Sequence, residues 1–195
     1  MSERREFLAS LGKGNIVTPP FKSCPRGRSG PTAARFPKVV VQDQNNKKAW
    51  FYEELIYNKL VLINFTSISG ERHYPIINNM VKVQEMLANR LDKDVFIYTI
   101  TTRPTEDSAA KLKIFAQNKG AKWQFLTGSP DNIREILKAF GIRGRINGLS
   151  WIGNEKTGRW LSKASRQHPL YIAEAVARLS TGKHYKPFLV DMRSV

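Results

Sequence analysis

Residues 61–75 read Val61-Leu62-Ile63-Asn64-Phe65-Thr66-Ser67-Ile68-Ser69-Gly70-Glu71-Arg72-His73-Tyr74-Pro75 and carry the clearest structural signal in the chain. The run from Val61 to Phe65 is apolar except for Asn64, which is typical of a strand buried on both faces. A polar turn follows, and Pro75 stands where the first turn of a helix tolerates proline. The apolar residues beyond it recur at three- and four-residue steps: Ile76, Ile77, Met80, Val83, Leu87 and Leu91. The pattern predicts a strand, a turn and a helix over 75–91.

The segments on either side of this stretch alternate between strand and helix patterns. Before it, short apolar runs at 39–43 and 49–52 flank a polar turn and predict a β-hairpin. After it, we expect strands at 94–101, 123–127, 149–154 and 158–161, and helices at 108–120, 130–140 and 169–179. Strands that alternate with amphipathic helices indicate an α/β protein with a mixed central sheet flanked by helices. The element order is that of a thioredoxin-like fold with an N-terminal β-hairpin.

Composition divides the chain into an arm, a domain and a tail. Residues 1–38 hold five prolines, four glycines and no lasting apolar period, and their eight basic and two acidic residues give a net charge of +6. Such a segment cannot offset its ordering entropy by burying its own apolar surface. We therefore predict an extended basic arm over 1–38, a folded domain over 39–180 and a tail over 181–195.

The charge of the chain favours acidic partners. The formal net charge is +16 over 195 residues, and such a field attracts an acidic protein surface, nucleic acid or an anionic membrane surface. No DNA- or RNA-binding motif is present, so charge alone supports nucleic acid. No apolar run reaches the roughly 18 residues that a transmembrane helix needs. The chain has a single cysteine, Cys24, so it cannot form an intramolecular disulfide.

The N-terminus resembles a twin-arginine export signal. The run Arg4-Arg5-Glu6-Phe7-Leu8 matches the Arg-Arg-x-Phe-Leu core of such signals. Glu3 stands where Ser or Thr is usual, and the chain after Leu11 is too polar for the apolar stretch of about 7–15 residues that export signals carry. We interpret the arm as holding a degenerate or retained signal. A basic, arginine-containing N-terminus also fits a mitochondrial setting, and a cytoplasmic one stays open.

Three stretches resemble the Sco/SenC family of thioredoxin-like copper chaperones. Residues 62–66, followed by Tyr74-Pro75, are similar to the family's first strand, its turn and its Cys-Pro helix start. Residues 99–107 are similar to its Ser-x-Asp-Pro-x-x-Asp segment, although Arg103-Pro104 replaces Asp-Pro. The most specific match is Trp-Gln-Phe-Leu-Thr-Gly-Ser-Pro at 123–130, with Lys-Ala-Phe-Gly-Ile at 138–142. The resemblance spans residues 38–180 and leaves most of the arm and the tail outside.

The resemblance also implies a copper site whose ligands this chain lacks. Members of the family bind copper through two cysteines in the first turn and a distal histidine, which suit Cu(I) and Cu(II). The matching positions are Ile68 or Ser69 for the first cysteine, Tyr74 for the second, and Ile146 or Asn147 for the histidine. We therefore predict no resident metal or cofactor. Peroxidase relatives of this fold need a thiolate, and that activity is excluded by the same absence.

Few side chains near this turn are left to carry chemistry. His73 is the one coordinating side chain in the turn, and it could hold copper if a partner supplied thiolates. His168 and His184 have no neighbour at ligand spacing. The other polar residues of the turn lack a paired base, a nucleophile or a substrate pocket in the sequence: Ser67, Ser69, Glu71 and Arg72. The sequence therefore predicts that the protein is not an enzyme.

The expected partner surface is basic. It comprises arginines of the arm and of the loop after residue 140: Arg4, Arg5, Arg26, Arg28, Arg35, Arg143 and Arg145. The resemblance implies a non-catalytic accessory subunit or assembly factor of a membrane-associated redox complex of respiratory type, on the periplasmic side, bound to an acidic surface of that complex. Two alternatives stay open. One is a copper chaperone or thiol-redox factor that uses His73 or Cys24 with partner-supplied ligands, and the weaker one is a nucleic-acid-binding protein.

Overall fold

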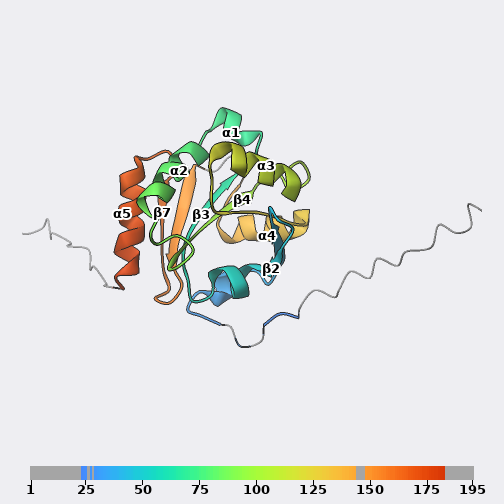
Figure 1. The fold of residues 1–195 in the computed structure, drawn as a ribbon. Helices are drawn as coiled ribbons and strands as arrows, with labels where there is room; N and C mark the ends of the chain where they lie inside the picture. Colours follow the sequence, from blue (N-terminus) through green and yellow to red (C-terminus); the bar gives the residue numbers. More distant parts are fainter. Residues whose placement is uncertain (1–22, 26, 28, 144–147, 183–195) are drawn as a thin grey trace, which may run out of the picture.

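The computed structural model describes residues 23–25, 27, 29–143 and 148–182 (Figure 1). Its strands are β1 (Val40–Asp43), β2 (Lys48–Trp50), β3 (Leu60–Thr66), β4 (Val95–Thr101), β5 (Gln124–Thr127), β6 (Leu149–Asn154) and β7 (Arg159–Ala164). Its α-helices are α1 (Gly70–His73), α2 (Ile77–Met86), α3 (Ala109–Lys119), α4 (Pro130–Ala139) and α5 (Pro169–Ser180). A 3-10 segment, η1 (Ala33–Arg35), and a π-helical segment, η2 (Phe51–Ile56), complete the set. The predicted α/β class and the predicted order of the main elements are confirmed.

The strands form one sheet in the order β2-β1-β5-β4-β3-β6-β7. Strands β3, β4 and β5 are parallel, and the remaining pairs are antiparallel, including the predicted hairpin of β1 and β2. The three parallel strands end on the same side of the sheet, where β6 begins, and we call this the carboxyl end of the sheet. The opposite side, where Leu60 of β3 lies beside Asn154 of β6, is the amino end.

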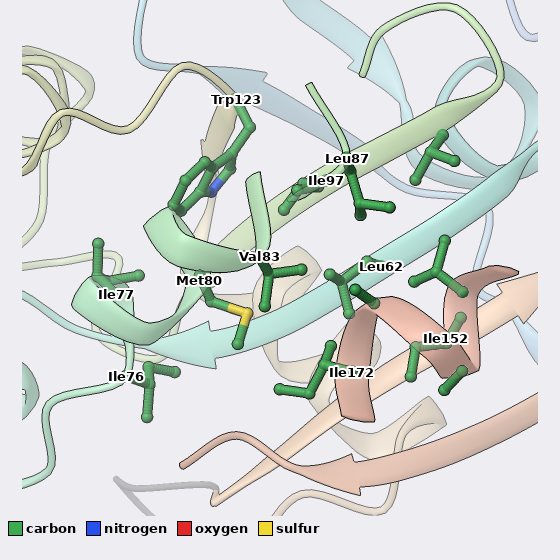
Figure 2. Close-up of a cluster of buried hydrophobic side chains, with 14 of the residues drawn as sticks. Leu62, Ile76, Ile77, Met80, Val83, Leu87, Ile97, Trp123, Ile152 and Ile172 are labelled. Carbon is green, nitrogen blue, oxygen red and sulfur yellow. The ribbon is translucent and has the colours of Figure 1, made fainter. Parts of the chain in front are cut away.

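One hydrophobic core lies between the sheet and helices α2, α3 and α5 (Figure 2). Leu62, Ile97 and Ile152 come from three adjacent strands and meet Met80 and Ile172 from two of the helices. Each of these side chains is almost fully buried. Successive side chains of a strand point to opposite faces, so alternate residues of β3 enter this core and the others enter a second core. This explains why β3 reads as a continuous apolar run.

The second core covers the other face of the sheet and is mainly aromatic. It packs η2 and α4 against the strands. Phe140 is 3% exposed, and its ring centroid lies 5.1–6.5 Å from those of Phe36, Phe51, Phe65, Trp151 and Trp160. Aromatic pairs at such separations add to the free energy gained by burial. This cluster therefore holds α4, β6 and β7 together.

Helix α2 is shorter than the helix predicted over 75–91. It begins at Ile77 because Ile76 has a non-helical backbone, with φ of −121°. It ends at Met86, and the chain then turns through Asp92, whose φ of 59° lies in the left-handed region. The apolar period that continues to Leu91 reflects packing against the first core rather than further helix.

The strand predicted at 49–52 ends at Trp50, and η2 follows directly. The Tyr57 N–H donates to the Tyr52 carbonyl at 2.8 Å, which closes a π-helical turn. The Glu54 carboxylate accepts the Trp50 N–H at 2.7 Å and holds the start of the segment. The sequence analysis assigns no helix to 53–56, because nothing in the pattern there separates a π-helical turn from an irregular one.

Residues 29–38, which we call the strap, pack against the domain although the sequence predicts an extended arm there. Phe36 is 6% exposed and belongs to the second core. Gly30 donates its N–H to the Tyr52 hydroxyl at 2.8 Å, and Thr32 donates its N–H to Glu155 Oε1 at 3.0 Å. Hydrogen bonds to a buried carboxylate and the burial of one ring offset the ordering entropy of the strap. The packed domain therefore starts with the strap.

Glu155 is the centre of the strap contact. Its carboxylate is buried and also accepts the Tyr52 hydroxyl at 2.7 Å and the Thr32 hydroxyl. Burial, together with the hydrogen bond to this carboxylate, raises the pKa of Tyr52. The tyrosine therefore keeps its proton at neutral pH and remains a donor.

Both ends of the described domain meet the amino end of the sheet. The strap reaches it at Glu155, which directly follows β6. Helix α5 reaches it where Asn154 donates from Nδ2 to the Leu179 carbonyl at 2.9 Å. In Figure 1 the strap and the last turn of α5 accordingly lie at the lower side of the domain, and α1 lies at the upper side.

Substitution of Gly153 by alanine should destabilise the pairing of β6 and β7. A Cβ atom at this position would lie 2.4 Å from the indole ring of Trp160, which sits opposite on β7. We expect the free energy of unfolding in urea to fall by about 1–3 kcal/mol, which is typical of overpacking. Gly128→Ala is the matched control, since its Cβ would meet no atom closer than 3.4 Å. Equal losses for both variants would contradict the prediction.

Candidate functional site

Three loops meet at the carboxyl end of the sheet. They follow β3 (residues 67–76), follow β4 (residues 102–108) and precede β6, where residue 148 is described. The positions that the sequence analysis matched to a metal site fall on the first and third of these loops. The geometry of the site therefore depends on how the two loops are held.

Glu71 is a buried carboxylate that holds the loop after β3. Its side chain is 6% exposed. Oε1 accepts the Ile76 N–H at 3.0 Å and the Thr66 hydroxyl at 3.2 Å, and Oε2 accepts the Ile77 N–H at 3.2 Å. These amides open α2, so the carboxylate lies at the positive end of the helix dipole. Glu71 is thus the anion at the N-terminus of α2, the place where thiolates are stabilised in reactive-cysteine proteins.

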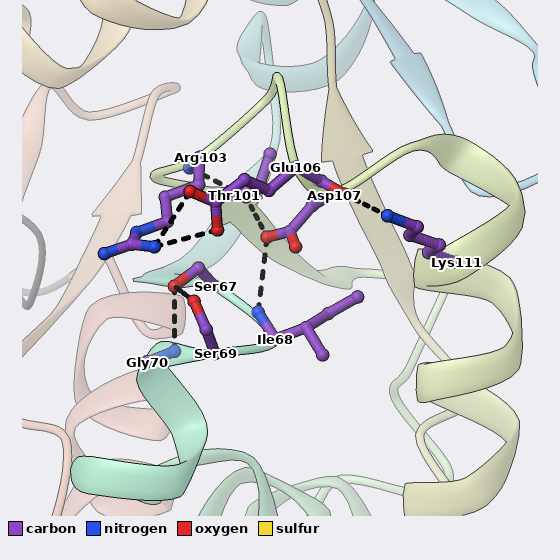
Figure 3. A network of polar contacts seen from close by, with 9 residues as sticks. All are labelled: Ser67, Ile68, Ser69, Gly70, Thr101, Arg103, Glu106, Asp107 and Lys111. Atoms are coloured by element: carbon purple, nitrogen blue, oxygen red, sulfur yellow. Dashed lines mark hydrogen bonds and ion pairs between the residues drawn. The ribbon is translucent and has the colours of Figure 1, made fainter.

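Asp107 joins the loops that follow β3 and β4 (Figure 3). Its carboxylate is 3% exposed and accepts the Ile68 N–H at 3.2 Å and the Thr101 hydroxyl at 2.6 Å. Its carbonyl accepts the hydroxyl of Thr127, the last residue of β5, at 3.1 Å. One residue therefore ties together the ends of all three parallel strands.

Arg103 does not leave an open positive charge at this end of the sheet. Its guanidinium forms an ion pair with Glu106 at 2.8 Å (Figure 3). The sequence comparison suggested an added charge at this position, and the structure shows that a carboxylate three residues later neutralises it.

Tyr74 fills the space between the first and third loops. Its ring packs on Gly148, where a Cβ atom would lie 3.0 Å from the tyrosine hydroxyl. The Arg166 guanidinium lies 5.1 Å from the centre of the same ring, within the range of a cation–π contact. Asn79 of α2 holds the loop that carries Arg166, because Nδ2 donates to the Ser165 carbonyl at 2.8 Å and to the Gln167 carbonyl at 2.7 Å.

The structure brings most of the predicted metal-site positions together. Ile68, Ser69 and Tyr74 are all partly buried in the loop after β3, and Tyr74 touches Gly148, the neighbour of Asn147. Ile146 and Asn147 themselves lie outside the described residues, as does His184. His73 is exposed on α1.

The serines of the turn have structural partners. Ser67 Oγ accepts the Gly70 N–H at 2.9 Å and lies 3.4 Å from Ser69 Oγ (Figure 3). Neither hydroxyl contacts a histidine among the described contacts. A serine needs a paired base to act as a nucleophile, so this geometry does not build one.

The predicted basic partner surface is only partly described. Arg4, Arg5, Arg26, Arg28 and Arg145 lie outside the described residues, and Arg143 is exposed. Arg35 lies on the strap, with its guanidinium 5.1–5.4 Å from the ring centres of Phe36, Phe140, Trp151 and Trp160. Partial burial against these rings lowers the pKa of Arg35. This side chain therefore also packs the strap onto the second core.

Cys24 lies away from the carboxyl end of the sheet. Its Sγ donates to Glu53 Oε1 in η2 at 3.4 Å. Desolvation and this carboxylate raise the pKa of the thiol. A protonated thiol is a poor nucleophile and a poor metal ligand, so this position does not supply a ligand to the loop after β3.

The donor atoms at the carboxyl end of the sheet do not fit copper. Copper prefers thiolate and imidazole ligands, and the loops present Tyr74, serine hydroxyls and two carboxylates that already hold backbone amides. The part of the chain that the structure describes contains no group of three or more His, Cys, Asp or Glu side chains placed to hold a metal ion. His73 alone supplies an imidazole, from the surface.

The middle of the chain matches a protein-family model. Residues 75–154 match the model described as SCO1/SenC, and this segment includes α2, the Asp107 loop and β6. This match covers 80 of the 195 residues, so the middle of the chain is similar to the SCO1/SenC family. The resemblance identified from the sequence is therefore confirmed. A search of curated proteins found no match.

Solved structures of Sco proteins share the fold of this chain. Copper-bound ScoI of Bradyrhizobium japonicum is 16% identical, with a TM-score of 0.56, and the match covers 73% of this chain and 98% of that one. BsSco, described as a member of the Sco family of cytochrome c oxidase assembly proteins, is 23% identical, with a TM-score of 0.62 and coverage of 74% and 92%. A SCO1/SenC family lipoprotein from Bacillus anthracis is 18% identical, with a TM-score of 0.60 and coverage of 74% and 94%. The predicted thioredoxin-like fold is confirmed.

No helix within the described residues has the length and apolar content needed to cross a bilayer.

Proposed function

We propose that this protein is a non-catalytic accessory subunit or assembly factor of a membrane-associated redox complex. One observation carries the proposal: the groups at the carboxyl end of the sheet are engaged in holding the loops. Glu71 holds the start of α2, Asp107 ties three strands together, and Tyr74 fills the gap beside Gly148. A site built in this way presents a fixed surface, and its described residues offer no open coordination position.

The descriptions of the relatives support the proposed setting of the complex. BsSco is described as a cytochrome c oxidase assembly protein, and the Bacillus anthracis relative is a lipoprotein. An assembly role on the outer side of a membrane, in the periplasm of a bacterium, extends these descriptions to this chain. The formal net charge of +16 favours a partner with an acidic surface.

Native purification tests the complex directly. We expect the full chain to co-elute from solubilised source membranes at fixed stoichiometry with subunits of a redox complex, as identified by mass spectrometry. Because charge drives part of the association, the complex should weaken as salt rises. Elution of the chain alone from both membranes and the soluble fraction, at low and moderate salt, would contradict the proposal.

A second candidate function is copper delivery with ligands from a partner. The exposed imidazole of His73, at the same end of the sheet as the loop after β3, favours it, and ScoI of Bradyrhizobium japonicum has the same fold and binds copper. In this function copper is cargo that a second protein helps to hold.

Copper titration separates the two functions. We expect the wild-type chain alone to show no saturable micromolar binding of Cu(I) or Cu(II), and His73→Ala to behave in the same way, because one imidazole is too few donors. The measurement is competition against a chelator of known affinity, followed by absorbance. Saturable binding by the wild type that His73→Ala abolishes would favour the copper function.

A further inference from the structure

A mixed basic and apolar surface lies at the carboxyl end of the sheet, beside Tyr74. We call it the ledge, and it consists of Arg72, His73, Tyr74, Arg166, Leu170 and Tyr171. All but Tyr74 are exposed, and the two large residues of α5 have high solvent exposure, with Leu170 at 56% and Tyr171 at 52%. Residues of large apolar area that face solvent beside cations are typical of protein-binding surfaces.

The parts of the ledge are fixed relative to one another. Arg166 lies over the Tyr74 ring, and Asn79 holds the carbonyls on both sides of Arg166. Four residues further on, Leu170 lies in the first turn of α5, which begins beside the helix that carries Asn79 (Figure 1). Glu71 fixes the loop that carries Arg72. Such a surface loses little conformational freedom when a partner binds.

The ledge has no acidic side chain of its own at the surface. Within residues 70–79 and 163–173 the basic residues are Arg72, Lys163 and Arg166, and the one carboxylate is Glu71, which is buried. The nearest carboxylate on the outer face of α5, Glu174, is ion-paired with Arg178 at 2.6 Å. Neither Arg72 nor Arg166 has an acidic partner in the described part of the chain. Their charges therefore stay available to an anion.

We propose that the ledge docks an acidic segment of a protein partner. The carboxylates of the segment pair with Arg72 and Arg166, and an apolar side chain of the segment packs on Leu170 and Tyr171. A protein segment supplies both kinds of contact. Nucleic acid offers phosphates and flat bases, and a lipid surface offers headgroups and chains over a wider area than these six residues span. The inference rests on the proposed function, because it names the surface that the partner would use.

Two charge-reversed variants of the full chain test this surface. The ledge variant carries Arg72→Glu and Arg166→Glu. The control carries Lys93→Glu and Lys156→Glu, two exposed lysines at the amino end of the sheet. Each pair of reversals changes the formal net charge from +16 to +12, so any difference between the variants comes from position. A third variant, with Leu170→Ser and Tyr171→Ser, tests the apolar contact without a change in charge.

The probe is a short synthetic peptide rich in aspartate and glutamate that carries one leucine and one tyrosine. Titration into isotope-labelled wild type should shift the amide signals of residues 72–76 and 165–171. We expect the ledge variant to bind at least about tenfold more weakly, the serine variant at least about threefold more weakly, and the control to stay within about twofold of the wild type. Urea unfolding of each variant verifies that it is folded.

Three results would overturn the ledge as a docking surface. If the control variant bound the peptide as weakly as the ledge variant, the net positive charge of the whole protein would attract the peptide, and not the ledge. Signal shifts confined to the amino end of the sheet would place the peptide elsewhere. Tighter binding of duplex DNA or of phosphatidylglycerol vesicles, lost in the ledge variant, would assign the surface to another class of partner. Co-elution with a redox complex is measured separately, so the proposed function can survive any of these results.

Discussion

Replacing Phe140 with alanine should lower the free energy of unfolding by about 3–5 kcal/mol, the range found when a buried phenylalanine is truncated. The ring is 3% exposed and contacts five other aromatic rings that come from the strap, η2, β3, β6 and β7. Its loss leaves a cavity at the point where these elements meet. The measurement is urea unfolding followed by tryptophan fluorescence and, independently, by circular dichroism.

The control for this prediction is Phe115→Ala. Phe115 is only partly buried and has one ring contact within the described structure, with Phe125 at 6.0 Å. We expect it to cost clearly less than Phe140→Ala, because fewer neighbours lose their contacts. Since Phe36 rests on Phe140, the Phe140 variant should also be cut faster by protease within the strap. A loss below about 1 kcal/mol would show that the aromatic cluster can repack.

Replacing Glu71 with alanine should cost about 2–4 kcal/mol, because a buried charged acceptor of three hydrogen bonds disappears. The N–H groups of Ile76 and Ile77 would then be buried without a partner, and α2 would lose the anion at its positive end. Urea unfolding measures the loss. Hydrogen exchange of these two amides should also become faster than that of the rest of α2.

Two further variants test whether the lost hydrogen bonds cause the expected loss of stability in Glu71→Ala. Glu71→Gln keeps the shape and one acceptor oxygen, so we expect a loss between that of the wild type and that of the alanine variant. Glu85→Ala removes an exposed carboxylate from the same helix and should change stability by no more than about 0.5 kcal/mol. If Glu71→Ala and Glu85→Ala were equally mild, Glu71 would not be the residue that fixes the site.

Much of the fold follows from local sequence pattern. The apolar run at 61–65, the hairpin at 39–52 and the periodic helices near 108–120, 130–140 and 169–179 lie within a few residues of β3, the β1–β2 pair, α3, α4 and α5. The helices bury one stripe of side chains and the hairpin strands bury alternate side chains. The spacing of the apolar residues therefore identifies each type of element. The helix predicted over 75–91 lies in the right place but is too long, because Leu87 and Leu91 keep the apolar period after the backbone has left the helix at Met86.

The strap could not be predicted in the same way. The strap is held in place by the burial of the Phe36 ring and by hydrogen bonds to Glu155, which lies more than a hundred residues away in the chain. A segment rich in proline and glycine reads as an extended arm unless the distant carboxylate is known. The sequence showed Phe36 and Glu155 but gave no means of pairing them.

The sequence points to the turn after the first buried strand, but not to how that turn is built. The family resemblance matches Ile68, Ser69 and Tyr74 to positions in this turn, and the structure has all three in the loop after β3. The sequence analysis weighed Glu71 only as an acid or base, whereas the structure uses it as a buried helix cap. An acidic residue six positions before a helix start is too common a pattern to signal this. Asn79 and Arg166 were missed, because their contacts join segments far apart in the chain.

Both ends of the described domain lie at the amino end of the sheet. Attachment of the protein near either of these ends therefore determines which way the ledge faces. The seven residues of β3 put about 20 Å between that end and the ledge. An anchor, a lipid or a neighbouring subunit that grips the chain near residue 29 or residue 180 would therefore turn the ledge outward. For the same reason, a surface or fusion partner attached close to residue 29 or residue 180 would leave the opposite end of the sheet accessible.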